Sequence, residues 1–177
     1  MDTVQAEGTI EVADLFLLEE PQLAAVLDQS ATGGGCWLGA RLVTHGRLKA
    51  DQGGLEFFAI WCPHCQNEAP ILNQIDAAFA PKGERTVSIL ASPYGRDYDT
   101  SGGTDRRLAD RGDLSWFDTT FKVQHTTLID PSFAVVNRYG ANSYPTIYVV
   151  DSSSTIRFAQ AGDVAYQDLA NALTQLH

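Results

Sequence analysis

The chain has 177 residues, of which 44% are hydrophobic and 19% are charged, so its composition excludes a disordered or fibrous protein. This length predicts a single domain that spans residues 1–177. The chain has 22 acidic and 12 basic residues and a net charge of −10, which argues against a nucleic-acid backbone or an anionic membrane surface as a partner.

The N-terminal third is predicted to lie outside the core of the domain. Residues 1–8 are predicted to be a flexible tail. Residues 9–54 are predicted to form an N-terminal extension with a short helix near residues 22–28. The first residues have no basic segment and only a four-residue apolar patch, Leu15–Leu18, so they are not a signal peptide as they stand. No apolar run approaches the roughly 18 residues of a membrane-spanning helix, so we expect no stable membrane insertion.

The remaining residues, 55–177, alternate between short apolar runs and segments with helical periodicity. Apolar runs followed by turn residues predict strands, and apolar residues spaced three or four apart predict helices. In chain order these are strand 55–60, helix 63–80, strand 86–91, strand 126–129, helix 133–139, strands 146–150 and 155–159, and helix 164–176. The polar segment 92–122 is predicted to be an insertion, and Gln52-Gly53-Gly54 a turn. Helices between strands, followed by a final hairpin, predict an α/β fold with a central mixed sheet flanked by helices.

Two of the three cysteines lie at the start of the first helix of this core, in Cys62-Pro63-His64-Cys65. Pro63 fits the first helical position, where its missing N–H has no partner in any case, so Cys62 is predicted to be the N-cap residue. A sulfur there lies at the positive end of the helix dipole, which favours the thiolate and lowers the pKa of a cysteine from about 8.5 to roughly 3.5–7.5.

Cys65 follows one helical turn later, at a spacing that suits a reversible disulfide with Cys62. We therefore expect an exposed Cys62 to attack the disulfide of a partner, and a shielded Cys65 to resolve the mixed disulfide. A protonated His64 stabilises the Cys62 thiolate further, which makes the disulfide a stronger oxidant. Cys36 stands alone and is left without an assigned role.

The segment Leu55–Cys65 resembles the active-site strand and helix of the thioredoxin superfamily. The Cys-Pro-His-Cys centre is similar to that of DsbA-type disulfide oxidases. Trp61, Glu68, Pro70 and the run Ser143-Tyr144-Pro145-Thr146 resemble TlpA/ResA-type thiol-disulfide oxidoreductases. The resemblance covers residues 55–177 and implies a thioredoxin-like fold.

The resemblance also implies roles for single residues. Pro145 matches the cis-proline of the family, and the backbone of Tyr144 beside it is expected to pair with an extended substrate. Glu56 matches the buried acid beneath the disulfide, where burial suits it to take the proton of Cys65. Trp61 is expected to pack beside the thiolate and shape the contact surface, and Glu68 to be a solvated helix residue.

The function that follows is exchange of disulfides with protein thiols through Cys62 and Cys65, with oxidation slightly favoured over reduction and no cofactor or metal. A membrane or soluble redox partner is implied. The alternative is a redox-silent binding module or a copper metallochaperone that uses the same two sulfurs. DsbA-type and TlpA/ResA-type proteins work outside the cytoplasm, so the resemblance implies an extracytoplasmic protein whose leader has been removed. A cytoplasmic location is the alternative interpretation.

Overall fold

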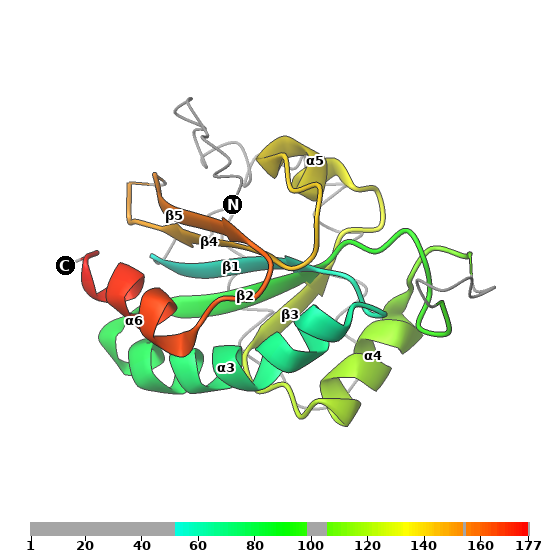
Figure 1. Ribbon diagram of the computed structural model, residues 1–177, viewed down its shortest axis with the longest axis horizontal. Coiled ribbons are helices and arrows are strands. Elements are labelled where there is room, and N and C mark those ends of the chain that lie inside the picture. The colour runs from blue at the N-terminus through cyan, green and yellow to red at the C-terminus, as the bar shows by residue number, and fades with distance from the viewer. Residues whose placement is uncertain (1–51, 99–105, 154, 177) are drawn as a thin grey trace, which may run out of the picture.

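The computed structural model describes residues 52–98, 106–153 and 155–176. The predicted tail, the helix near residues 22–28 and Cys36 lie outside these residues, as does part of the predicted insertion. The described residues form a central sheet with helices on both faces (Figure 1).

The sheet has five strands in the order β3-β2-β1-β4-β5. The strands are β1 (Gly53–Phe58), β2 (Arg85–Leu90), β3 (Thr126–Ile129), β4 (Thr146–Val150) and β5 (Ile156–Ala161). β1, β2 and β3 run parallel, whereas β4 is antiparallel to both β1 and β5. The mixed sheet and the final hairpin are therefore as the sequence predicts.

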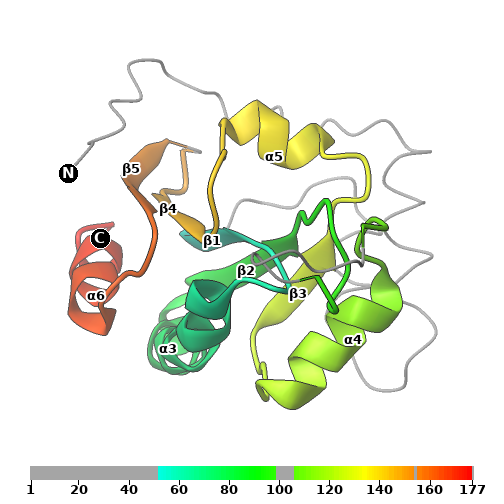
Figure 2. The same ribbon diagram turned by 45° about the vertical axis from the view of Figure 1, so that its right-hand side comes forward.

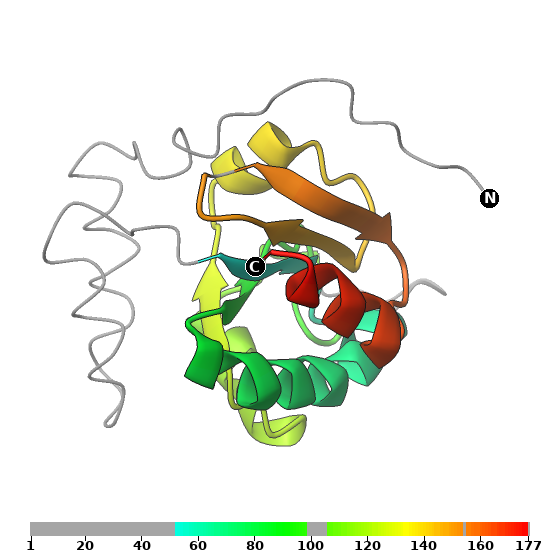
Figure 3. The ribbon, with the colours of Figure 1, turned by 90° about the vertical axis from the view of Figure 1, so that its left-hand side faces the viewer.

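The helices cover the two faces of the sheet unequally. They are α3 (Pro63–Phe79), the short η2 (Ala80–Lys82), α4 (Arg111–Thr120), α5 (Ala134–Tyr139) and α6 (Tyr166–Thr174). Helices α3, α4 and α6 lie on one face, and α5 lies on the other (Figures 2 and 3). The thioredoxin-like arrangement expected from the sequence is thus present.

Alternation along β1 explains how both faces are filled, because successive side chains of a strand point to opposite sides. Phe57 packs with Tyr139 of α5, and Phe58 packs with Phe117 of α4, their ring centroids 4.7 Å apart. Glu56 has the same parity as Phe58, so its carboxyl group enters the face that α3 covers.

β1 begins and ends two residues earlier than predicted. Gly53 and Gly54 are the first strand residues rather than part of a turn. A Cβ atom at Gly53 would lie 2.0 Å from the carbonyl oxygen of Arg85, so only glycine allows β2 to approach so closely. The strand ends at Phe58 because the N–H of Cys62 donates to the carbonyl of Ala59 (3.1 Å), which turns the chain toward α3.

The segment 92–122, predicted to be an insertion, contains the helix α4. Parallel neighbours such as β2 and β3 require a crossover connection, and α4 supplies it. Asp110 caps this helix by accepting from the N–H of Asp113 (3.1 Å), whose carboxylate accepts in turn from the N–H of Asp110 (2.9 Å). Two aspartates of this polar segment thus form a capping box at the start of a helix.

Candidate active site

Cys62 is the N-cap residue of α3, and Pro63 is the first residue of the helix, as predicted. The turn that closes β1 brings the end of the strand directly to this cap. Free backbone N–H groups at the start of a helix carry partial positive charge. The fold therefore places a sulfur atom where negative charge is stabilised.

Both cysteines of the motif are buried. Cys65 is 1% exposed, as expected for a shielded residue, but Cys62 is only 5% exposed, so the prediction of an exposed Cys62 is wrong. Cys62 packs in a cluster with Phe58 and Ala69, and Trp61 and Tyr144 lie against this cluster. The side chains around the motif therefore limit the approach to the sulfur.

The pKa of the Cys62 thiol is lowered to about 6. The largest cause is a hydrogen bond from the Cys65 side chain, and the backbone N–H groups of Cys65 and His64 add to it; burial acts in the opposite direction. Burial, followed by the interaction with Cys62, raises the pKa of Cys65 far above its ordinary value. One sulfur is thus ionised near neutrality, while the other keeps its proton until a base takes it.

The loop before β4 closes over Cys62. The Tyr144–Pro145 peptide bond is cis, as the resemblance implies. The Cys62 thiol donates to the carbonyl oxygen of Tyr144, 3.3 Å away. This carbonyl therefore accepts from Cys62 when the thiol is protonated and loses that donor when Cys62 ionises.

Aromatic side chains surround the motif on the side of β2. Trp61 donates to the hydroxyl of Ser92 (2.9 Å), which lies just after β2. Its ring packs edge-on against Tyr98 and Tyr144, with centroids 5.2 and 6.5 Å away. Tyr94 stacks on Tyr98 at 3.9 Å. Trp61 thus belongs to a half-exposed aromatic group beside Cys62.

His64 is exposed and pairs with Asp163, which lies between β5 and α6. Its Nδ1 is 2.9 Å from a carboxylate oxygen of Asp163. The hydrogen bond to Asp163 raises the pKa of His64, so the ring carries a positive charge over a wider pH range than a free histidine. This cation contributes to the lowered pKa of Cys62, but it is the last of the causes.

Replacement of His64 by glutamine is expected to raise the pKa of Cys62 by less than about one unit, because the hydrogen bond from Cys65 remains. The rate of alkylation by iodoacetamide against pH measures this pKa. High salt should reduce the difference between the variant and the wild type, since the pair is exposed. A return to the ordinary thiol pKa would instead make His64 the main cause.

Glu56 is buried beneath the motif, as expected. Its pKa is raised to about 8, chiefly because burial penalises the carboxylate, and Glu68 and Cys62 raise it further. Among the described residues, its Oε1 atom has no hydrogen-bond partner. The carboxyl group is therefore protonated at neutral pH and ionises just above it.

Glu68 is not a solvated residue, contrary to prediction, because it is only 1% exposed. One turn after His64, it accepts from the backbone N–H of Val164 (3.3 Å). Burial is the main reason why its pKa is raised to about 7. The loop residues Asp163 and Val164 therefore contact the start of α3 twice, at His64 on the outside and at Glu68 on the inside.

Several of these contacts carry no signal in the sequence. His64 and Asp163 are 99 positions apart. Tyr94 and Tyr98 fall within a polar segment that gives no reason to select them. The four-residue spacing of His64 and Glu68 places them on one helix face, which is the only hint that one loop contacts both.

The chain is similar to known thiol-disulfide oxidoreductases in sequence and to solved structures in fold. The chain is 25% identical over 122 residues to the thiol-disulfide oxidoreductase ResA of Geobacillus thermodenitrificans. It is 26% identical over 118 residues to a thiol:disulfide interchange protein DsbE homolog of Paracoccus denitrificans. The structure matches a putative DsbE of Chlorobium tepidum with a TM-score of 0.60 at 20% identity, over 72% of this chain and 81% of the other. The chain has the thioredoxin-like fold of these proteins.

The match is limited in extent. The residues aligned with ResA make up 69% of this chain and 61% of the ResA protein. Those aligned with the DsbE homolog make up 66% of this chain and 54% of that protein, so the chain spans less than two thirds of either relative. StoA of Bacillus subtilis has the same fold, with a TM-score of 0.55 at 16% identity over 69% of this chain and 81% of its own. No family model matches the sequence.

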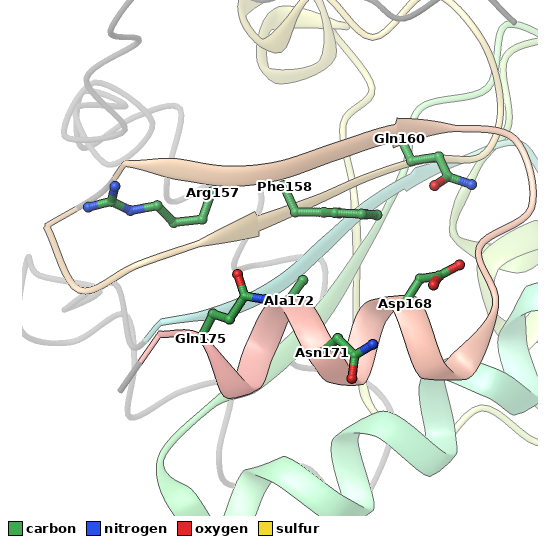
Figure 4. Close-up of a pocket in the computed structure, with 7 residues that line it drawn as sticks. All are labelled: Arg157, Phe158, Gln160, Asp168, Asn171, Ala172 and Gln175. Carbon is green, nitrogen blue, oxygen red and sulfur yellow. The ribbon is translucent and has the colours of Figure 1, made fainter.

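Other features of the thioredoxin-like protein lie away from the cysteines. A cavity of about 230 Å³ opens between β5 and α6, lined by residues such as Phe158, Asp168 and Asn171 (Figure 4). Within the described ranges, no helix is long and apolar enough to cross a membrane. The same residues contain no group of three or more histidine, cysteine or acidic side chains able to hold a metal ion.

Proposed function

We propose that this protein is a thiol-disulfide oxidoreductase in which Cys62 is the nucleophile and Cys65 the resolving residue. The observation that carries the proposal is the contrast between two thiols one helical turn apart. Cys62 has a pKa of about 6, whereas the pKa of Cys65 is far above its ordinary value. Attack requires a thiolate, and resolution requires a second thiol that stays protonated until needed.

In the proposed reaction the Cys62 thiolate attacks a disulfide of a protein substrate and forms a mixed disulfide. The ionised form of Glu56, a minor fraction at neutral pH because its pKa is about 8, then takes the proton of Cys65, whose sulfur displaces the substrate sulfur and closes the Cys62–Cys65 disulfide. The substrate is reduced and the protein oxidised; the same steps in reverse donate a disulfide to protein thiols. Pro63, His64 and Trp61 tune the couple, and Tyr144 and Pro145 position the partner.

Oxidation of substrates is the favoured direction. A stabilised thiolate stabilises the reduced protein and so makes its disulfide a stronger oxidant. The pKa of Cys62, about 6, lies between the values of about 7 in thioredoxin and about 3.5 in DsbA. We accordingly expect a reduction potential between about −270 and −120 mV. Resemblance to ResA and DsbE supports work outside the cytoplasm, with a membrane or soluble redox partner.

The test uses the protein with Cys36 replaced by serine, so that only one thiol pair remains. Reduction of insulin and oxidation of reduced ribonuclease measure the two directions, and equilibration with glutathione gives the potential. We expect turnover in at least one assay and more in oxidation. No turnover in either, together with tight Cu(I) binding, would replace this proposal with a metallochaperone or binding module.

A further inference from the structure

A chain of buried polar groups leads from Glu56 to the far edge of the parallel strands. Glu56 and Ser88 are register partners on the neighbouring strands β1 and β2, so their side chains lie on the same face of the sheet, and interaction with Ser88 lowers the pKa of Glu56. The Ser88 hydroxyl oxygen lies 2.8 Å from Nε2 of His125. Nδ1 of His125 lies 3.1 Å from Oδ1 of Asn73, on α3. Glu56, Ser88 and His125 are all buried.

The surroundings of Asn73 set the direction of these hydrogen bonds. Its Nδ2 donates to the carbonyl of Lys122 (2.9 Å), and its Oδ1 accepts from the N–H of Gln124 (2.7 Å). Since Oδ1 is an acceptor, Nδ1 of His125 carries the hydrogen. A neutral imidazole has one N–H, so its Nε2 accepts from the hydroxyl of Ser88.

This direction defines the state of Glu56. Ser88 has one hydrogen, which it donates to His125, so its oxygen can accept a hydrogen bond from the protonated carboxyl group of Glu56, its register partner on β1. When Glu56 loses its proton, the hydroxyl hydrogen of Ser88 turns toward the carboxylate. The oxygen of Ser88 then faces Nε2 of His125, a contact that is favourable only if Nε2 carries a proton.

We propose that Ser88 and His125 form the route by which the proton of Cys65 reaches solvent. The inference rests on the proposed role of Glu56 as the acceptor of that proton. Glu56 passes a proton to the Ser88 oxygen while Ser88 passes its own hydrogen to Nε2 of His125. The imidazolium then loses its Nδ1 proton to a solvent water that replaces Asn73 Oδ1 as the acceptor, next to the exposed residues Gln124 and Thr126, and keeps the new hydrogen on Nε2.

Bonds, electrons and the proton of Cys65 are all accounted for when the disulfide closes. The S–H bond of Cys65 breaks, and its sulfur forms a bond with the sulfur of Cys62. The bond between Cys62 and the substrate sulfur breaks, and its electron pair leaves on the substrate. The substrate disulfide gains two electrons from the cysteine pair, and the proton of Cys65 leaves through Glu56, Ser88 and His125.

The surroundings of His125 keep its ring neutral at rest, so protonation of His125 during proton transfer is brief. Burial lowers the pKa of His125 to about 4, while the carboxylate of Asp76 on α3 acts in the opposite direction. Asp76 also accepts from the N–H of Thr86 (3.0 Å), which holds it in place. At the other end, Glu56 interacts electrostatically with Glu68 and Cys65 of α3 and with Cys62, the N-cap residue of that helix.

A two-phase reaction with Ellman's disulfide tests this route in the Cys36→Ser protein. Attack by Cys62 releases one thionitrobenzoate, and resolution by Cys65 releases a second. Ser88→Ala is expected to slow the second phase on the order of tenfold or more and to weaken its dependence on pH and on deuterated solvent. Ser88→Thr, which keeps the hydroxyl, should restore the rate.

Two further variants separate proton transfer from structure. His125→Gln keeps an acceptor and a donor but has no ring to protonate, so it should also slow the second phase. Thr86→Val removes a hydroxyl from the same face of β2, outside the route, and controls for general damage. The first phase reports on Cys62 alone, and circular dichroism checks folding in each variant.

The outcomes are distinct. A second phase unchanged in Ser88→Ala and His125→Gln, but slowed in Glu56→Gln, would overturn the route and leave Glu56 as the acceptor. If the rate of the second phase is also unchanged in Glu56→Gln, Glu56 does not accept the proton of Cys65, and the proposed route is wrong. Absence of a second phase in the wild type would contradict the proposed function itself.

Discussion

Replacement of Cys65 by serine is expected to abolish turnover and to leave Cys62 joined to its substrate as a mixed disulfide. Attack persists because the serine hydroxyl can still donate to the Cys62 sulfur, and that hydrogen bond is the main cause of the lowered pKa. Resolution is lost because no second sulfur remains. Mass spectrometry of the Cys36→Ser, Cys65→Ser protein after mixing with a disulfide peptide measures the adduct.

Two matched variants sharpen this experiment. Cys65→Ala removes the donor as well as the sulfur, so it should form the same adduct more slowly at neutral pH. Cys62→Ser should form none, since Cys65 is buried and its pKa is raised. An adduct on Cys65 in that variant, equal in rate to the one on Cys62, would contradict the assigned roles.

Replacement of Glu56 by glutamine is expected to stabilise the reduced protein at high pH, by up to about 5 kcal/mol at pH 9. The pKa of Glu56 is raised from 4.5 to about 8 on folding, chiefly by burial. Between these values the unfolded chain loses the proton that the folded protein keeps. The wild type therefore loses stability as pH rises from 4.5 to about 8, and glutamine, which does not ionise, avoids this loss.

Urea denaturation of both reduced proteins at pH 4 and pH 9 measures the effect. At pH 4 the carboxyl group is largely protonated in both states, so the difference should be small. The lowered pKa of Cys62 adds stability between about pH 6 and 9, but it does so in both proteins and largely cancels in their difference. Asp97→Asn, at an exposed carboxylate, serves as the control. A glutamine variant no more stable than the wild type at pH 9 would show that Glu56 is ionised without penalty.

The part of the fold that local pattern determines could be predicted from the sequence. The strands Thr126–Ile129 and Thr146–Val150 have the predicted bounds, and helix α3 ends one residue early. Each is a short apolar run or a periodic segment with clear turn residues around it. The N-cap position of Cys62 was likewise predictable, because proline after a strand marks the first residue of a helix.

Long-range packing decided the features that could not be predicted. α4 has few apolar residues, and its capping box is made of two aspartates within the polar segment that was predicted to be an insertion. Glu68 looks like a solvated helix residue until the loop at Val164 closes over it. The contact between Ser88 and His125 joins residues 37 positions apart, and no local spacing indicates it.

The ionisation of the Cys62 sulfur is the claim on which the proposed chemistry depends. It is measured by the ultraviolet absorbance of the thiolate in the reduced Cys36→Ser protein, titrated against pH, with Cys62→Ser as the blank. The expected midpoint is about 6. A midpoint near 9, the ordinary value for a cysteine thiol, would contradict the account.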